Sequence, residues 1–134
     1  MKIIITMAGR GSRFKKQGID EEKHRLEIDG KTMFEWSMES LEDFFEEDFI
    51  FITRSSNEDS GFIQDKCRDL GISNVEIIEI DGLTDGQAST VLKAEDLIGK
   101  EESIAIYNID TYIESGNIKK TQIKGDGNIP VFRA

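Results

Sequence analysis

Short apolar runs alternate with helical patterns along this chain, and that alternation limits the folds open to it. Each run is too short to be a typical helix and is rich in β-branched or aromatic residues. Such runs are typical of strands in a parallel sheet, where both faces are buried. Parallel strands need crossover connections, usually helices. The runs are Lys2–Thr6, Asp48–Thr53, Asn74–Ile80, which alternates more than the others, and Ser103–Asp110.

Helical patterns fill the segments between these runs. Thr32 can cap the first helix, whose apolar residues recur at helical spacing. Gly71 can end the second helix, because glycine readily takes the left-handed conformation found after helix ends. The expected helices span residues 32–45, 60–70 and 87–97, and residues 128–132 have the pattern of one more strand.

Three strand–helix units in series predict a mainly parallel sheet with right-handed crossovers. We therefore expect an α/β fold, three-layered and Rossmann-like, with helices on both faces of the sheet. The chain has no internal repeat, low-complexity tract or linker. At 134 residues it is long enough for one buried core, so we expect a single domain over residues 1–134.

Composition narrows the possible partners. A net charge of −10 argues against nucleic acid, which requires a basic face. No run approaches the roughly 18 apolar residues that suggest a membrane span. The one cysteine, Cys67, excludes an internal disulfide and favours a reducing compartment. We therefore expect a cytoplasmic protein.

The stretch "IIITMAGRGSRFKK" places glycines and basic residues where the first strand ends. Exposed backbone N–H groups and positive charge at such a point are typical of a phosphate site. A basic cluster in an acidic protein suits a small polyanion, although it could also be ordinary surface charge. The cluster comprises Arg10, Arg13, Lys15, Lys16, Lys23, Arg25 and Lys31.

Other motifs are incomplete. Phe14 stands where a dinucleotide-binding loop has its third glycine. The "DGKT" segment lacks the glycine that a P-loop needs, because Arg25 occupies its position, so Gly30 and Thr32 are expected to form a turn and a helix cap. A single histidine, His24, argues against a catalytic triad or a multi-histidine metal centre.

Ligands of open parallel sheets bind beyond the carboxyl ends of the strands. Two loops, residues 9–13 and 85–88, and the carboxylate of Asp110 are expected at this edge. An Asp at a strand end can be a turn residue, or it can hold Mg²⁺ that bridges phosphate oxygens.

Four segments in order resemble the sugar-phosphate nucleotidyltransferases, most closely the bacterial capsule-type subgroup. They are "AGRGSRF", "EKHRLEIDGKTMFEW", "DGQAST" and "YNIDTY", and the resemblance runs from Met1 to about Ile113. The family uses Mg²⁺ to join a nucleoside triphosphate (NTP) and a sugar 1-phosphate into an NDP-sugar and pyrophosphate. The resemblance therefore implies the nucleotide-binding half of a glycosyltransferase-A-like fold and a role in polysaccharide precursor synthesis.

The resemblance also implies the site residues. Arg13 would neutralise the β- and γ-phosphates, and Lys23 would stabilise charge near the α-phosphate. Asp110 would hold Mg²⁺. Catalysis of this kind needs positioning and charge neutralisation but no protein nucleophile. The implied nucleotide-binding residues are Ala8, Gly9, Gly11 and Ser12 at the triphosphate, and Gly86, Gln87 and Ala88 at the base.

Two departures leave alternatives open. Glu22 and His24 flank Lys23 where the family usually has proline, and family catalytic domains continue beyond residue 134, so we expect the sugar-binding half to be missing. The alternatives are a cytidylyltransferase acting on a phosphorylated alcohol or choline, a non-catalytic nucleotide-binding domain, and a flavodoxin-like domain whose glycine loop is only a turn. A pyrimidine nucleotide is weakly preferred, and an oligomer is possible.

Arg13→Ala separates a phosphate site from a turn. If the 9–13 loop binds phosphate, the substitution should abolish NTP affinity, because it removes the charge opposite the β- and γ-phosphates. If the loop is a turn, affinity should not change. Thermal unfolding of both proteins with and without nucleotide measures the difference.

Overall fold

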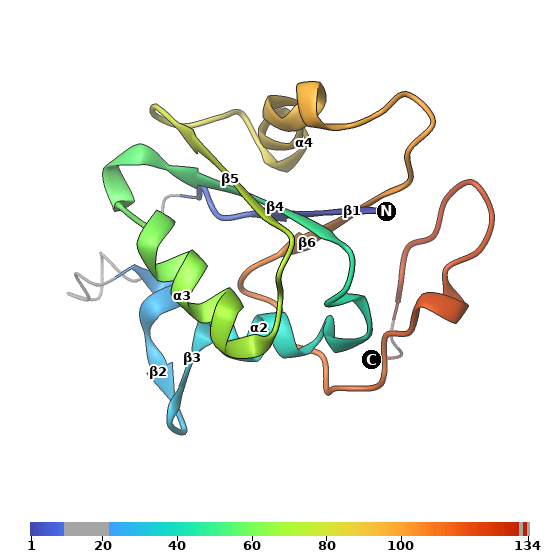
Figure 1. The fold of residues 1–134 in the computed structure, drawn as a ribbon, viewed down its shortest axis with the longest axis horizontal. Coiled ribbons are helices and arrows are strands. Elements are labelled where there is room, and N and C mark those ends of the chain that lie inside the picture. Colours follow the sequence, from blue (N-terminus) through green and yellow to red (C-terminus); the bar gives the residue numbers. More distant parts are fainter. Residues whose placement is uncertain (10–21, 132, 134) are drawn as a thin grey trace.

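The structure, a computed structural model, describes residues 1–9, 22–131 and 133. Its main sheet has four strands in the order β5-β4-β1-β6, and every neighbouring pair is parallel. The predicted mainly parallel sheet is confirmed (Figure 1). The strands are β1 (Lys2–Thr6), β4 (Asp48–Arg54), β5 (Val75–Ile80) and β6 (Ile104–Asn108).

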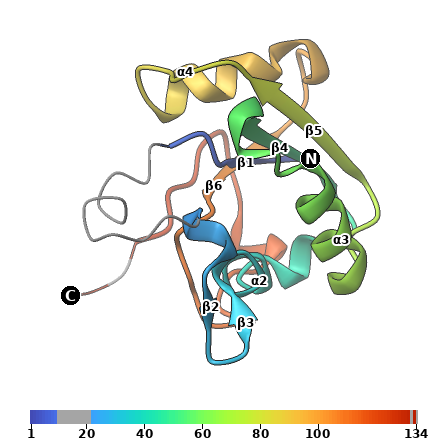
Figure 2. The ribbon, with the colours of Figure 1, turned by 90° about the vertical axis from the view of Figure 1, so that its left-hand side faces the viewer.

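Helices cover both faces of this sheet. Helices α2 (Met33–Glu39) and α3 (Ser60–Leu70) lie on one face. Helix α4 (Gln87–Val91) and the 3₁₀ helix η4 (Leu92–Leu97) lie on the other. Figures 1 and 2 show α4 on the opposite side of the sheet from α2 and α3. The three-layer α/β/α architecture is therefore confirmed.

The two sheet faces carry separate apolar clusters because successive side chains of a strand point to opposite faces. Ile3 and Ile5 of β1 pack with Phe34 of α2, whereas Ile4 packs with Ala94 of η4. The three isoleucines are at most 1% exposed. Burial on both faces makes β1 the centre of the fold and explains its continuous apolar sequence.

The predicted start of α2 at Thr32 and the predicted end of α3 at Gly71 are both confirmed. The Thr32 hydroxyl accepts a hydrogen bond from the Glu35 N–H, and the Glu35 carboxylate accepts one from the Thr32 N–H, which completes a capping box. Gly71 ends α3 in the left-handed conformation, at φ 86°. Asp29 and Gly30 also have positive φ and form the turn between two short antiparallel strands.

Several elements differ from the expectation. Three short elements that were not expected lie within residues 22–32: the 3₁₀ turn η1 (Lys23–Arg25) and the strands β2 (Glu27–Ile28) and β3 (Lys31–Thr32). The first helix is α-helical through Glu39 and then gives way to the 3₁₀ turn η2 (Glu42–Phe44). Two further 3₁₀ turns are η3 (Ser55–Asn57) and η5 (Lys120–Gln122).

The ends of two predicted elements also differ. The third helix is α-helical through Val91 and 3₁₀ from there to Leu97. The predicted strand at 128–132 is wrong for the residues described there, 128–131, which form no strand. A strand needs a hydrogen-bonded neighbour. Ile129 and Val131 are instead 87% exposed. Within the described part of the chain, no helix is long and apolar enough to cross a membrane.

Cys67 provides a probe of this fold. Its side chain is buried beneath α3, and burial raises the pKa of the thiol to about 12. The thiol therefore stays protonated at pH 8, whereas unfolding returns its pKa to an ordinary value. A disulfide reagent at pH 8 should label no thiol in the native protein and one per chain in denaturant. Rapid native labelling would contradict the packing of α3.

Candidate nucleotide site

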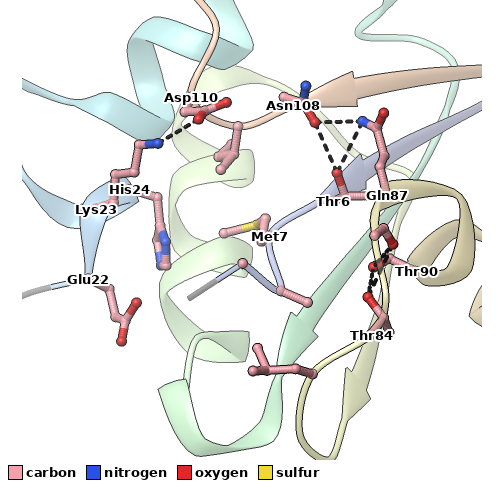
Figure 3. Close-up of a pocket in the computed structure, with 15 residues that line it drawn as sticks. Thr6, Met7, Glu22, Lys23, His24, Thr84, Gln87, Thr90, Asn108 and Asp110 are labelled. Atoms are coloured by element: carbon pink, nitrogen blue, oxygen red, sulfur yellow. Dashed lines mark hydrogen bonds and ion pairs between the residues drawn. The ribbon is translucent and has the colours of Figure 1, made fainter. Parts of the chain in front are cut away.

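A cavity of about 500 Å³ lies beyond the carboxyl ends of β1 and β6, between η1 and the loop that leads into α4 (Figure 3). This size is typical of a small-molecule site. The position is the one expected for ligands of a parallel sheet. Six of the residues predicted from the sequence line it together: Ala8, Gly9, Lys23, Gly86, Gln87 and Asp110.

The other predicted residues fall into two groups. Ala88 is exposed on α4 and is not among the lining residues. Gly11, Ser12 and Arg13 lie outside the described residues.

Helix α2 positions the segment that carries Asp110. The Ser37 hydroxyl donates to the carbonyl oxygens of Asn108 and Thr111, at 3.2 and 2.8 Å. The Ser40 hydroxyl accepts from the Ile113 N–H at 2.9 Å. Both serines are 1% exposed. These buried contacts fix the turn after β6 and so fix where the carboxylate projects.

Lys23 and Asp110 meet at one wall of the cavity. Lys23 Nζ donates to Asp110 Oδ2 at 2.5 Å, although the two residues are 87 positions apart in sequence (Figure 3). Their side chains are 30% and 43% exposed. The pair therefore lies at the cavity wall in contact with solvent, where an ion pair contributes little to stability and can exchange partners.

The turn that carries Lys23 is anchored at its other residues. Arg25 Nε and Nη2 both donate to Asp59 Oδ1, at 3.0 and 2.8 Å, and Thr53 Oγ1 donates to Asp59 Oδ2 at 3.0 Å. His24 Nε2 lies 2.9 Å from Asp59 Oδ1, but the contact is too poorly aligned to count as a hydrogen bond.

Asp59 is fully buried, at 0% exposure. Burial raises the pKa of its carboxyl group, but His24, Arg25 and Thr53 lower it by more, so the pKa lies below its usual value. A carboxyl group with a lowered pKa in the folded state stabilises the fold above its unfolded pKa. That contribution is lost as the pH falls through the lower folded value.

On the opposite wall, polar side chains at the strand ends form a network with α4. Gln87 Nε2 donates to Asn108 Oδ1 at 2.5 Å and lies 3.5 Å from Thr6 Oγ1 (Figure 3). The hydroxyl of Thr90 donates to the Gly86 carbonyl at 3.0 Å. The side-chain N–H₂ group of Gln87 thus faces Thr6 and Asn108, and the side-chain oxygen of Gln87 points away from these two residues (Figure 3).

Sequence reasoning missed several lining residues. Thr6 and Asn108 end neighbouring strands in register, so the predicted topology could have placed them at the site. His24 is 3% exposed and lines the cavity. No local signal predicts this burial, because it depends on Asp59, in a distant part of the chain.

The cavity residues are compatible with a magnesium ion bound together with phosphates. The described residues contain no group of three or more His, Cys, Asp or Glu side chains that could hold a metal. Mg²⁺ bound with nucleotides usually takes one or two protein carboxylates and completes its shell with phosphate oxygens and water. Asp110, at the cavity wall, provides one such carboxylate.

No protein-family model matches the chain, and no curated protein matches it. Solved structures do match. A nucleoside-diphosphate-sugar pyrophosphorylase from Vibrio cholerae is 34% identical, with a TM-score of 0.79 over 91% of this chain and 52% of that one. The chain thus spans about half the length of that protein.

Two more distant structures share the fold. The inositol-1-phosphate CTP transferase from T. maritima is 22% identical, with a TM-score of 0.64 over 81% of this chain and 43% of that one. UTP-bound UGPase from Acinetobacter baumannii is 23% identical, with a TM-score of 0.60 over 87% and 47%. The structural neighbours of this chain are nucleoside-diphosphate-sugar pyrophosphorylases and nucleotidyltransferases, and the family resemblance predicted from the sequence is confirmed.

Proposed function

We propose that this chain carries the nucleotide site of a nucleotidyltransferase that joins an NTP and a sugar 1-phosphate into an NDP-sugar and pyrophosphate. One observation carries the proposal: Ala8 and Gly9 at the start of the glycine loop, Lys23, the Gly86–Gln87 corner and Asp110 all line one cavity. The 34% identity to a pyrophosphorylase over 91% of the chain supports it.

The proposed chemistry needs no nucleophile from the protein. An oxygen of the sugar phosphate attacks the α-phosphorus of the NTP, and the bond from that phosphorus to the bridging oxygen of the β-phosphate breaks. Pyrophosphate leaves with that bonding pair. The attacking oxygen is already ionised, so no general base is required. The work of the protein is to align the two phosphates and neutralise their charge.

Lys23 and the glycine loop are suited to this work. The ammonium group of Lys23 would face the α-phosphate, and backbone N–H groups from Ala8 to Ser12 would hold the triphosphate together with Arg13. Asp110 would hold Mg²⁺, which supplies positive charge to the phosphate oxygens when bound. A nucleotide and its cation would then replace the Lys23–Asp110 contact with two others, ammonium to phosphate and carboxylate to metal.

The finer identity of the substrates belongs to the same proposal. The base would lie at Gly86 and Gln87, and the acceptor oxygen of Gln87 suits the donor edge of a pyrimidine, so we propose a pyrimidine nucleotide there. The neighbours are about twice as long, so the sugar-binding residues would lie in polypeptide outside the aligned half. We place the enzyme in the cytoplasm and in polysaccharide precursor synthesis.

Thermal unfolding with ATP, GTP, CTP, UTP and dTTP, each with and without Mg²⁺, tests nucleotide binding without an acceptor. Ligand at ~100 times its Kd adds about 2.7 kcal/mol, which should raise the Tm by several degrees. We expect a Mg²⁺-dependent rise with one pyrimidine nucleotide. No rise with any nucleotide would contradict the proposal.

An assay for pyrophosphate release with the binding nucleotide then separates the reactions. Release with a hexose 1-phosphate supports the proposal, and release with choline phosphate alone supports a cytidylyltransferase. Tight binding without release from a chain that includes the sugar-binding half would indicate a non-catalytic domain.

Lys23→Ala and Asp110→Asn should weaken Mg²⁺–nucleotide binding by roughly ten-fold or more while lowering stability by less than about 1 kcal/mol, because their ion pair is exposed. Lys120→Ala is the matched control. It removes a comparable ion pair, Lys120 Nζ to Glu47 Oε1 at 3.0 Å. This pair lies beside the amino end of β4, whereas the cavity lies at the carboxyl ends of the strands. Titration should show unchanged affinity in this control. Equal losses in all three variants would contradict the assigned site.

A further inference from the structure

Asp59 stands at a helix N-cap, but its side chain does not cap the helix. It is the N-cap residue of α3, an 11-residue helix, where an Asp side chain commonly accepts a hydrogen bond from the first turn. Here the side chain makes no capping hydrogen bond. It is fully buried and turned toward Thr53 and Arg25 instead. The side chain thus forms a long-range contact with Arg25 in place of a local hydrogen bond to the first turn of α3.

The long-range contact holds the turn that carries Lys23. Arg25 forms two hydrogen bonds with Asp59 Oδ1 and a third with the Glu58 carbonyl at 3.1 Å. Glu58 has a left-handed backbone, with φ 51°, which costs free energy and is tolerated where surrounding contacts enforce it. The backbone before α3 is thus shaped to receive the guanidinium.

Phe62 of α3 packs against the same two residues, His24 and Arg25. The centroids of the His24 and Phe62 rings are 5.7 Å apart, and Arg25 Cζ lies 4.9 Å from the centroid of the Phe62 ring. His24 and Arg25 are therefore held between Asp59 and Phe62. They directly follow Lys23 in one 3₁₀ turn, so fixing them limits the directions that the Lys23 side chain can take.

We propose that Asp59 is a positioning residue for the nucleotide site: by holding His24 and Arg25, it directs the Lys23 ammonium group into the cavity. Its functional importance rests on the proposed nucleotide site. The placement of Lys23 by Asp59 does not, because it can be measured without ligand.

The ligand-free test measures how fast an acetylating ester modifies Lys23, read by peptide mass spectrometry. In the native protein the ion pair with Asp110 should slow this reaction. Asp59→Asn and Arg25→Met should each raise the Lys23 rate by roughly three-fold or more, toward the rate in Asp110→Asn, because an unanchored turn lets the pair open. Arg25→Lys should give an intermediate rate.

Glu47→Gln is the matched control, because Glu47, like Asp110, pairs with a lysine: Lys120 Nζ lies 3.0 Å from Glu47 Oε1. It should raise the rate at Lys120 and leave Lys23 unchanged. If Asp59→Asn fails to fold, Arg25→Met decides. A Lys23 rate that stays at the native value in a folded variant, while Glu47→Gln gives its expected change, overturns the proposal.

A double-mutant cycle on nucleotide affinity separates positioning from a merely structural role. Asp59→Asn should weaken binding by roughly ten-fold when Lys23 is present and by less than about two-fold in the Lys23→Ala background. Its effect on Tm should be the same in both. Equal affinity losses in both backgrounds overturn the positioning role. If the native protein binds no nucleotide, the proposed function fails, and the acetylation rates still decide whether Asp59 places Lys23.

Discussion

The pairing of β1 with strands on both of its sides is the constraint on which the rest of the structure depends. In these two parallel registers, Thr6 is level with Ile52 of β4 and with Asn108 of β6. Met7 to Gly9 follow β1 and the Asp110 turn follows β6, so the two segments leave neighbouring strands at the same edge. Because β1 is buried on both faces, a one-residue slip in either register would turn each of its isoleucines toward the wrong apolar cluster and misalign the two halves of the site.

The sheet alone does not complete the cavity. Asp110 depends on two buried serines, Ser37 of α2 and Ser40 directly after it, and Lys23 depends on contacts with the start of α3. Both helices cover the same face of the sheet (Figures 1 and 2). The opposite face contributes the Gly86–Gln87 corner at the start of α4. The candidate site therefore draws on all three layers of the fold, so the proposed nucleotide binding would depend on all of them.

Much of the fold could be predicted because its signals are local. Thr32 and Gly71 mark helix ends through hydrogen bonds and backbone conformations within a few residues. Parallel topology then placed Ala8, Gly9, Gln87 and Asp110 at one edge, and the structure has these four residues in one cavity. The short η1 turn was not predictable, because Arg25 and the Asp59 that anchors it are 34 positions apart.

The ion pair at the cavity wall could not be predicted from the sequence either, because its two residues are also far apart along the chain. Lys23 and Asp110 were each predicted from a motif, yet nothing in either motif indicates that they contact each other. The end of α2 at Glu39, earlier than predicted, was also not predictable from local sequence. Ser37 and Ser40 read as ordinary helix positions, and their bonds to the turn after β6 appear only when the layers are assembled. Long-range contacts thus determine the details that local patterns leave open.

The proposed nucleotide site is best tested by a ¹H–¹⁵N NMR titration of the protein with UTP and Mg²⁺. A nucleotide bound there should cause saturable shifts concentrated at the amides of Ala8, Lys23, Gln87 and Asp110. Amides at the opposite edge of the sheet, such as Asn74, should not move. Shifts that cluster at that opposite edge, or that never saturate, would contradict a nucleotide site at the carboxyl ends of β1 and β6.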